Sequence, residues 1–566
     1  MHVVTKRWQV PPRLTPEAER ALRGYPPILG QILYNRGYAT HEAAQKYLEA
    51  HPPSVTDPFR MLHVDTAVRR LIEAIRERQK IVVYGDYDVD GVTGAALLVQ
   101  ALEAWDAQVS VYIPNRFDEG YGLNTEALTF LKEEGAQVVV TVDCGVRSFA
   151  EADYARDLGL DLIVTDHHHP GDRLPSALAV INPKRTDDPY PEKDLAGVGV
   201  AYKLACALYE RMSGDRQQPK HLLDLVALGT VADLAPLVNE NRYLVRAGLQ
   251  QMGTTHREGL LSLMRVAGVM SHRVTARDIG FALGPRLNAA GRLDSAIAAY
   301  ELLITDDLTI AGRITQRLDA QNRERQEITR QIQTQVEEQT ITEDEVPLLL
   351  FAADPDFSLG VVGLAASRLA EKYYRPAIVA QQMEEYVRGS CRSIPEFHIT
   401  KALDECSDLL IHHGGHAAAA GFTLHAHDLE AFCRRVGEIA KAELATLDLR
   451  PTLTADAEVA LKDLKPEVLE YLSWLEPTGY GNPEAVFVTR DLKVGQARQV
   501  GNEGKHLKFT LSDGWVTFDA IAFRQGHWYE NLPDKVDVLY TFELNVYNGY
   551  ETLQLNVRDI KAAAGE

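Results

Sequence analysis

The stretch from residue 80 to residue 183 alternates apolar runs of strand length with amphipathic segments of helix length. Strands that are apolar on both sides are buried on both faces, so this alternation predicts a parallel sheet covered by helices on each side. We expect helices near 94–105, 125–134 and 148–158. The strand-like runs are KIVVYGD (80–86), QVSVYIP (108–114), QVVVTVD (137–143), DLIVTDH (161–167) and ALAVINP (177–183).

The pattern changes several times along the chain and predicts five regions. The last region contains five strand-like runs separated by Gly, Asn and Asp turns, which is typical of a small closed barrel of the OB type. The fold class is therefore α/β, with a parallel-sheet domain and a smaller α/β domain joined by a long helix, followed by an all-β OB-fold barrel. The regions are an N-terminal helical part (1–50), the main α/β domain (51–300), a long polar connecting helix (301–345), the second α/β domain (346–447) and the barrel (448–566).

The formal charge of −21 argues against a protein coated in nonspecific DNA-binding charge, although a local basic groove stays compatible with it. No run of about 18 apolar residues is present, so we expect no membrane-spanning helix. The N-terminal residues lack the apolar core of a signal peptide. The five cysteines are scattered and form no CxxC pair, which favours a reducing cytoplasm.

Acidic and histidine side chains follow three of the predicted strands. Asp86, Asp88 and Asp90 follow the first run, Asp143 follows the third, and the segment Asp166–His169 follows the fourth. The carboxyl ends of parallel strands meet at one edge of a sheet, so these side chains are expected to converge. Close carboxylates repel one another and stay ionised only with a cation between them. The sequence therefore predicts a metal site.

Each of these residues also has an ordinary structural explanation. A single aspartate after a strand more often caps a helix, and a histidine pair is more often structural. The DxDxDG segment resembles part of a calcium loop, but Leu97 stands where that loop needs glutamate. Asp233 lies in an apolar helical stretch and needs either a metal or a helix end as its partner. Together, mixed carboxylate and imidazole ligands favour Mn²⁺, with Mg²⁺ next and zinc less suited.

Two motifs connect these residues to a known family. Asp166-His167-His168 is similar to the signature of the DHH phosphoesterases, and Gly414-Gly415-His416 resembles the GGH motif of their accessory domain, DHHA1. The order of the regions resembles the exonuclease branch of that family over nearly the whole chain. The resemblance implies a metal-dependent exonuclease that degrades single-stranded DNA 5′→3′ to 5′-mononucleotides in DNA repair and recombination. It also implies two divalent metal ions, Mn²⁺ in preference to Mg²⁺.

The resemblance also assigns roles to individual residues. Asp143 would bridge the two ions, while His168 and His416 would face the scissile phosphate beside it. Inorganic pyrophosphatases of the family have a histidine where this chain has Tyr84, so Asp86 would take the place of that ligand. The implied metal ligands are Asp86, Asp88, Asp90, Asp143, His167 and Asp233.

Further residues are implied to bind DNA. The segment 284–292 resembles another family motif, and its Arg286, Asn288 and Arg292 would contact the phosphate backbone, although these arginines could equally pair with surface acids. The 5′-phosphate pocket would consist of Arg116, Tyr121, Ser390 and Arg392, because arginine binds phosphate in a bidentate manner; as ordinary loop residues they would have no such role. One or two barrel rings should be exposed for base stacking, from Phe509, Trp515, Phe518, Phe523 and Tyr547.

The expected partners are single-stranded DNA with a 5′ end and single-strand binding protein, and the chain is taken to be a monomer that binds no membrane. One alternative is an oligoribonuclease or cyclic-dinucleotide phosphodiesterase of the same family, but those relatives lack the N-terminal region and the barrel. Another alternative is a catalytically inactive DNA-binding homologue. The matched acids are all present, which argues against it.

Overall fold

The structure is a computed structural model that describes residues 5–51, 56–116, 118–214, 219–342, 345–547 and 549–563, without the side chain of Tyr547. Its internal contacts divide the chain into two compact units. The larger unit contains Val10–Asp319 and Thr454–Glu566, and the smaller unit contains Met1–Gln9 and Ala320–Leu453. None of the helices in the described part combines the length and apolar character needed to span a bilayer.

A five-stranded parallel sheet forms the centre of the main α/β domain, in the order β3-β2-β4-β5-β6. This confirms the predicted parallel sheet, because each strand lies within a few residues of an apolar run in the sequence. The strands are β2 (Lys80–Gly85), β3 (Val109–Tyr112), β4 (Ala136–Val142), β5 (Asp161–Thr165) and β6 (Ala179–Ile181).

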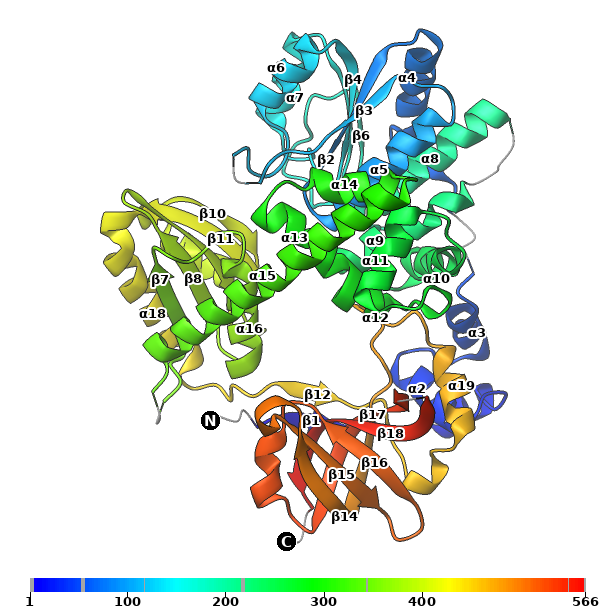
Figure 1. The fold of residues 1–566 in the computed structure, drawn as a ribbon, viewed down its shortest axis with the longest axis vertical. Coiled ribbons are helices and arrows are strands. Elements are labelled where there is room, and N and C mark those ends of the chain that lie inside the picture. The colour runs from blue at the N-terminus through cyan, green and yellow to red at the C-terminus, as the bar shows by residue number, and fades with distance from the viewer. Residues whose placement is uncertain are drawn as a thin grey trace. The chain divides into compact units, whose positions relative to one another are not determined.

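Helices cover both faces of this sheet (Figure 1). Ile81 and Val83 pack into the core under α4 (Val64–Arg76), α5 (Val89–Glu103) and α8 (Gly197–Ser213). Val82 and Tyr84 point to the other face, under α6 (Thr125–Glu133) and α7 (Phe149–Asp157). Alternate residues of β2 therefore enter different cores, which is why its sequence is apolar without interruption.

Helix α5 begins five residues before its expected start near Gly94, because the Asp88 side chain accepts the Gly91 N–H and caps it. Gly94 lies inside this helix where it meets the sheet: a Cβ there would be 2.5 Å from the Val142 side chain. The helix can therefore approach β4 closely, which holds the loop after β2 against the end of β4.

The segment after the sheet is mostly helical, as expected. Residues 284–292 form most of a regular helix that has Pro285 in its first turn, where the missing N–H costs nothing. A π-helical turn (Ile279–Leu283) precedes it. The helices are α9 (Leu223–Ala232), α10 (Asn239–Gly253), α11 (Glu258–Ala267), α12 (Ala276–Asp278), α13 (Gly284–Leu293), α14 (Ile297–Ile304) and the 33-residue α15 (Leu308–Thr340).

The smaller unit contains a five-stranded sheet in the order β10-β11-β9-β8-β7. Only β7 and β8 are parallel, and the remaining neighbours are antiparallel. Its elements are β7 (Leu350–Asp354), α16 (Val362–Tyr373), β8 (Ala377–Gln382), β9 (Tyr386–Arg392), α17 (Ile399–Asp404), β10 (Leu410–His416), β11 (Ala419–His425) and α18 (Leu429–Leu444).

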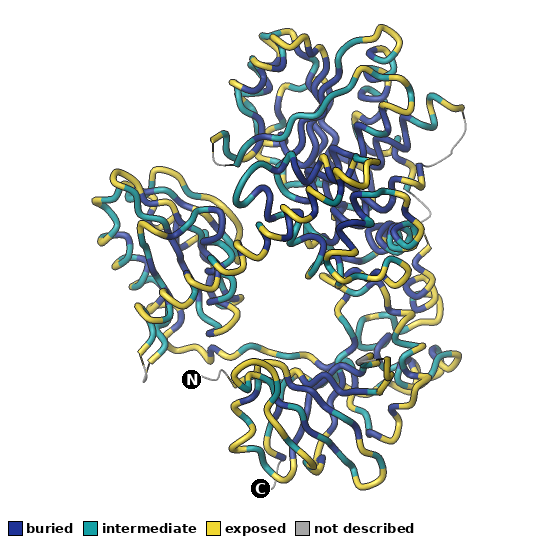
Figure 2. The backbone as a smooth tube through the Cα atoms, in the orientation of Figure 1, coloured by how far each residue is buried: buried dark blue, intermediate teal, exposed yellow. Residues whose placement is uncertain are grey.

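The C-terminal strands form the predicted barrel, which closes because β14 pairs with both β15 and β17. The N-terminal helices pack into the same core, because Leu29 and Ile32 belong to the cluster of buried residues that contains Phe487 and Phe509. Figure 2 shows buried stretches of backbone in the barrel strands. The N-terminal elements are β1 (Arg7–Gln9), α1 (Pro16–Ala21), α2 (Pro27–Asn35) and α3 (His41–Glu49). The C-terminal elements are β12 (Thr452–Thr454), β13 (Ala457–Glu458), α19 (Pro466–Ser473), β14 (Phe487–Val500), β15 (His506–Ser512), β16 (Thr517–Ala522), β17 (Lys535–Tyr547) and β18 (Tyr550–Ala562).

Candidate metal centre and phosphate pocket

Three neighbouring strands end in register at the candidate site. Gly85 pairs with Val142, and Val142 pairs with Thr165, so the residues that follow them come side by side at one edge of the sheet. The chain leaves β2 for β3 on one side and returns to β4 on the other, and ligands bind at such a reversal of strand order. The register therefore delivers the predicted acids to one crevice.

The predicted ligands form three overlapping groups, in each of which the ligand atoms lie within 4.8 Å of one another. All six residues that we predicted as metal ligands are in these groups, together with His168. The groups are Asp86, Asp88 and Asp143; Asp90, His167 and Asp233; and Asp143, His167 and His168.

His167 and Asp143 face each other at the centre of these groups. Burial lowers the pKa of His167 to about 3, so the imidazole is neutral at pH 7. It donates to the backbone of Leu195, and because Nε2 has no hydrogen-bond partner, Nδ1 carries that proton. Nε2 lies 3.0 Å from Asp143 Oδ1, which is also buried without a hydrogen-bond partner. Two electron-rich atoms in this position fit a shared divalent cation.

The acids of the site also need a cation for electrostatic reasons. Burial and the charge of Asp88 raise the pKa of Asp86 well above its ordinary range, and one buried oxygen of Asp86 accepts no hydrogen bond. Burial and neighbouring carboxylates raise the pKa of Asp90 to about 7 and that of Asp233 to about 9, and they raise the pKa of Asp143 too. A bound cation would favour the ionised form of each acid and would therefore oppose these shifts.

Local structure holds several of these side chains in place. Asp90 is fully buried and accepts the N–H groups of Gly197 and Val198, at 2.6 and 2.7 Å, at the start of α8. Asp233 follows the last residue of α9, so its position is compatible both with an aspartate at a helix end and with a metal ligand. Tyr84 contributes no ligand, because it is fully buried and its hydroxyl donates to the Gly122 carbonyl at 3.0 Å.

Asp166 is a residue whose role the sequence analysis did not identify. Its carboxylate accepts the N–H groups of Val146, His167 and His168 at 2.7–3.0 Å, and it lies 2.8 Å from His168 Nδ1. These bonds outweigh the effect of burial and lower its pKa. Asp166 therefore orients both histidines, and its position after β5 is the same signal that identified Asp86 and Asp143.

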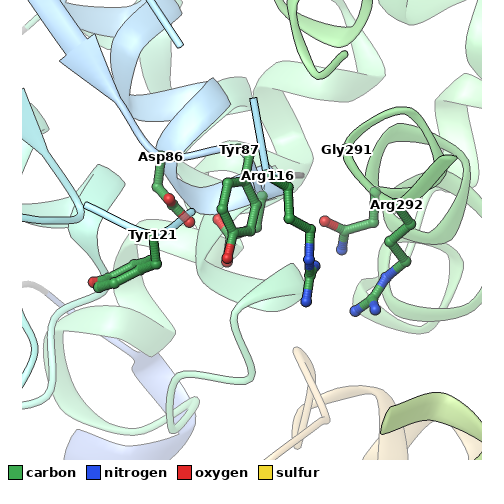
Figure 3. Close-up of a pocket in the computed structure, with 8 residues that line it drawn as sticks. Asp86, Tyr87, Arg116, Tyr121, Gly291 and Arg292 are labelled. Atoms are coloured by element: carbon green, nitrogen blue, oxygen red, sulfur yellow. The ribbon is translucent and has the colours of Figure 1, made fainter. Parts of the chain in front are cut away.

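A cavity of about 230 Å³ opens beside the acids (Figure 3). The Arg116 guanidinium lies 4.9 Å from the centre of the Tyr87 ring, and the Tyr121 hydroxyl donates to the Asp143 carbonyl at 3.1 Å. Two arginines next to carboxylates suit a phosphate ester bridged to a metal. The lining residues are Asp86, Tyr87, Asp88, Arg116, Tyr121, Asn288, Gly291 and Arg292.

Arg286 does not line this cavity, and the other predicted phosphate ligands belong to the smaller unit. Arg286 donates to Asp319 at 2.9 Å and to the Ala282 carbonyl at 2.7 Å, which is the pairing with an acid that the sequence left open. In the smaller unit, Arg392 and His416 both pair with Ala419, on its two sides, so they end the two strands that flank β11.

Ser390 and Arg392 also meet at the first turn of α16. A Cβ at Gly363 would lie 3.4 Å from the Ser390 hydroxyl and 3.2 Å from the Arg392 guanidinium. Ser390 and Arg392, both predicted as phosphate ligands, therefore lie close to each other.

Among the barrel rings, Trp515 and Phe523 are 89% and 52% exposed, whereas Phe509 and Phe518 are buried. The side chain of Tyr547 is outside the described residues. Two exposed rings agree with the expectation of one or two.

Known proteins resemble the whole chain. The family model for the DHH family N-terminal domain matches residues 80–230, that for the DHHA1 domain matches residues 345–442, and that for the RecJ OB domain matches residues 455–559. The chain is 37% identical to the single-stranded-DNA-specific exonuclease RecJ of Salmonella typhimurium (94% of this chain, 96% of the relative) and 36% identical to that of Bacillus subtilis (94% and 68%). The crystal structure of RecJ in complex with Mn²⁺ from Thermus thermophilus superposes with a TM-score of 0.84 and 32% identity, over 99% of this chain and 80% of that one.

Proposed function

The chain belongs to the RecJ family of single-stranded-DNA-specific exonucleases, and we propose that it hydrolyses single-stranded DNA with two divalent cations, Mn²⁺ or Mg²⁺. The observation that carries this proposal is the contact between His167 Nε2 and Asp143 Oδ1, which are 3.0 Å apart, buried and without hydrogen-bond partners. Relatives have been crystallised with Mn²⁺ and with Mg²⁺.

Asp86, Asp88 and Asp143 would hold one ion, Asp90, His167 and Asp233 would hold the other, and Asp143 would contribute to both. When bound, the two ions would activate a water molecule and stabilise the charge that develops on the phosphate. The close contact of Asp143 with His167 supports its role as the bridge.

His168 is suited to contact the scissile phosphate. Burial lowers its pKa, but the hydrogen bond to Asp166 and the charges of Asp166, Asp90 and Asp88 together raise it more, so the net shift favours the imidazolium. Because Nδ1 faces Asp166, Nε2–H remains to donate to a phosphate oxygen, and the side chain is 43% exposed. His416 of the smaller unit would contact the same phosphate, as the family resemblance implies.

The 5′→3′ direction would follow from a pocket for the terminal phosphate. Arg116 and Tyr121 line the cavity beside the metal ligands, and Ser390 and Arg392 of the smaller unit would complete it. The product would be a 5′-mononucleotide. Arg292 and Asn288, which line the same cavity, would bind the next phosphates, and Arg286 would join them only by leaving Asp319.

Several further statements belong to the same proposal. We retain the five-region division of the chain, with roles in DNA repair and recombination, a monomeric state and single-strand binding protein as a partner. A cytoplasmic location is supported by the five free cysteines, four of which are buried.

The test is digestion of long single strands labelled at the 5′ or 3′ end, with Mn²⁺, Mg²⁺ or a chelator. The proposal expects early release of the 5′ label, loss of cleavage with the chelator, and little activity on a dinucleotide. Asp143→Asn should abolish cleavage. Asp106→Asn is its matched control, since Asp106 is exposed and has the same left-handed backbone (φ 56° against 65°). Cleavage by Asp143→Asn at the rate of the control would refute the proposal.

A further inference from the structure

A loop of the C-terminal barrel region (448–566, called the barrel module below) packs on the segment that follows Asp233. The loop is Gly479–Asn482, between α19 and β14, and its Tyr480 carbonyl accepts the Leu237 N–H at 2.7 Å. A Cβ at Gly481, which has φ +73°, would lie 3.0 Å from the Pro236 side chain. Backbone therefore meets backbone only three or four residues after a proposed metal ligand.

This loop is held firmly by the N-terminal helices. Asn482 is 3% exposed, and its amide donates to the carbonyls of Leu475 and Pro477 at 2.9 and 2.8 Å. Its oxygen accepts from the Tyr47 hydroxyl at 2.7 Å and from Arg36 at 3.0 Å. These four bonds use the full hydrogen-bonding capacity of the Asn482 side chain, which anchors the end of the loop.

Arg242 of α10 joins the segment just before this loop to the main α/β domain. It is 2% exposed, and its guanidinium donates to the carbonyls of Leu475 at 2.7 Å and Pro477 at 3.2 Å, while it lies 4.4 Å from the centre of the Tyr47 ring. Because α10 begins at Asn239, just after the contacted segment, Pro236 and Leu237 are fixed from both the barrel module and α10.

Asn241, in the first turn of α10, connects this segment to the other ligands of the same ion. Its amide donates to the Pro236 carbonyl at 3.1 Å and to the Asp194 carbonyl at 2.6 Å. Asp194 precedes Leu195, whose backbone binds His167. The N–H groups that hold Asp90 follow two residues later.

Asp233 is more exposed than the other two ligands of the same ion. It follows the end of α9, its side chain is 22% exposed, and Leu234 after it has φ +60° and lies exposed. By contrast, Asp90 and His167 are held by their own hydrogen bonds. A ligand at the end of a helix can shift unless the following segment is fixed.

We propose that the Gly479–Asn482 loop and Asn241 are positioning elements for Asp233, so that the packing of the barrel module sets the affinity of the metal site formed by Asp90, His167 and Asp233. The inference rests on the proposed two-ion function and adds to it a regulator of one site. Loss of an outer partner of a metal ligand typically weakens metal binding 10–100-fold. A small displacement of the loop should act in the same way.

The test is Gly481→Ala in the full chain, measured by calorimetric titration of chelator-treated protein with Mn²⁺. The added Cβ meets Pro236, so we expect one of the two binding events to weaken about 10-fold or more and the other to stay unchanged. Gly514→Ala is the matched control: Gly514 also has a positive φ (+92°) in the barrel, but a Cβ there meets nothing within 4 Å. Its isotherm should match the wild type.

Asn241→Ala provides a second, independent variant, with Gln250→Ala on the exposed face of the same helix as its control. Both loop and Asn241 variants should regain cleavage when the Mn²⁺ concentration is raised, which a purely structural defect would not allow. If both variants bind two Mn²⁺ ions as the wild type does, the inference is overturned and the proposed function stands. If the wild type itself binds no Mn²⁺, the metal-dependent function is lost with it.

Discussion

Replacement of Asp143 by asparagine should stabilise the metal-free protein while removing its response to Mn²⁺. Asp143 is 2% exposed, and burial together with the charges of Asp90 and Asp88 raises the pKa of its carboxyl. Asparagine keeps the shape and tolerates the left-handed backbone at this position (φ 65°). It also offers an N–H donor to His167 Nε2, 3.0 Å away.

The magnitude follows from the distances in the site. The ligand atoms of Asp86, Asp88 and Asp143 lie within 4.8 Å of one another. At that separation and an effective dielectric constant near 20, two like charges repel by about 3 kcal/mol. Buried acids avoid part of this repulsion by binding protons, so we expect a gain of about 2 kcal/mol in the free energy of unfolding. The melting temperature of the larger unit should rise by about 2–4 °C in chelator.

With Mn²⁺ present, the wild type should instead be more stable than Asp143→Asn. A site at 100 times its dissociation constant contributes about 2.7 kcal/mol to the native state, and two sites contribute more. Differential scanning calorimetry of the wild type, Asp143→Asn and Asp106→Asn, each with chelator and with Mn²⁺, measures both effects. The reasoning is refuted if Asp143→Asn melts below the wild type in chelator, or if it keeps the wild-type response to Mn²⁺.

Three other changes test separate parts of the structure. Gly291→Ala should lower the free energy of unfolding in urea by about 2 kcal/mol, because its Cβ would lie 2.6 Å from the Tyr87 carbonyl. Gly312→Ala in α15, where a Cβ meets nothing within 4 Å, should raise it by about 0.5–1 kcal/mol. Equal effects of the two substitutions would contradict the packing around Gly291. Trp515→Ala should weaken binding of long single strands by about 1–3 kcal/mol in fluorescence anisotropy, and unchanged affinity would exclude stacking there. Arg242→Met should destabilise the larger unit by about 3 kcal/mol, since it removes the guanidinium donors to the carbonyls of Trp474 and Tyr47, while Asn482 still donates to those of Leu475 and Pro477; a thermal melt like that of the wild type would contradict this.

Sequence rules predicted the sheet and the meeting of its acids because both follow from local patterns. The apolar runs define β2, β4 and β5, and parallel pairing then brings Asp86, Asp143 and Asp166 to the same edge. The role of Asp166 was not predictable in that way. It depends on a side-chain direction, toward three backbone N–H groups, that no spacing encodes.

The contacts around Asp233 were beyond sequence reasoning for a different reason. Asn482 contacts Arg36 and Tyr47, which are more than 400 positions away in the chain, and no periodic pattern records such a pairing. The Gly479–Asn482 segment is typical of a turn, and only the three-dimensional structure shows what that turn touches. The same is true of the barrel rings, since alternation places Phe509 and Phe518 inside but is silent about Trp515 in its turn.

The shared core of the N-terminal helices and the barrel has a consequence for biosynthesis. Leu29 and Ile32 leave the ribosome first, while the barrel residues that cover them, such as Phe487 and Leu555, are made roughly 450 to 520 residues later. At about 5–20 residues per second, the helices wait roughly 20–100 s without their packing partner. The nascent chain therefore exposes an apolar surface until the barrel has been made, and a chaperone that binds apolar segments at the ribosome would find a site there.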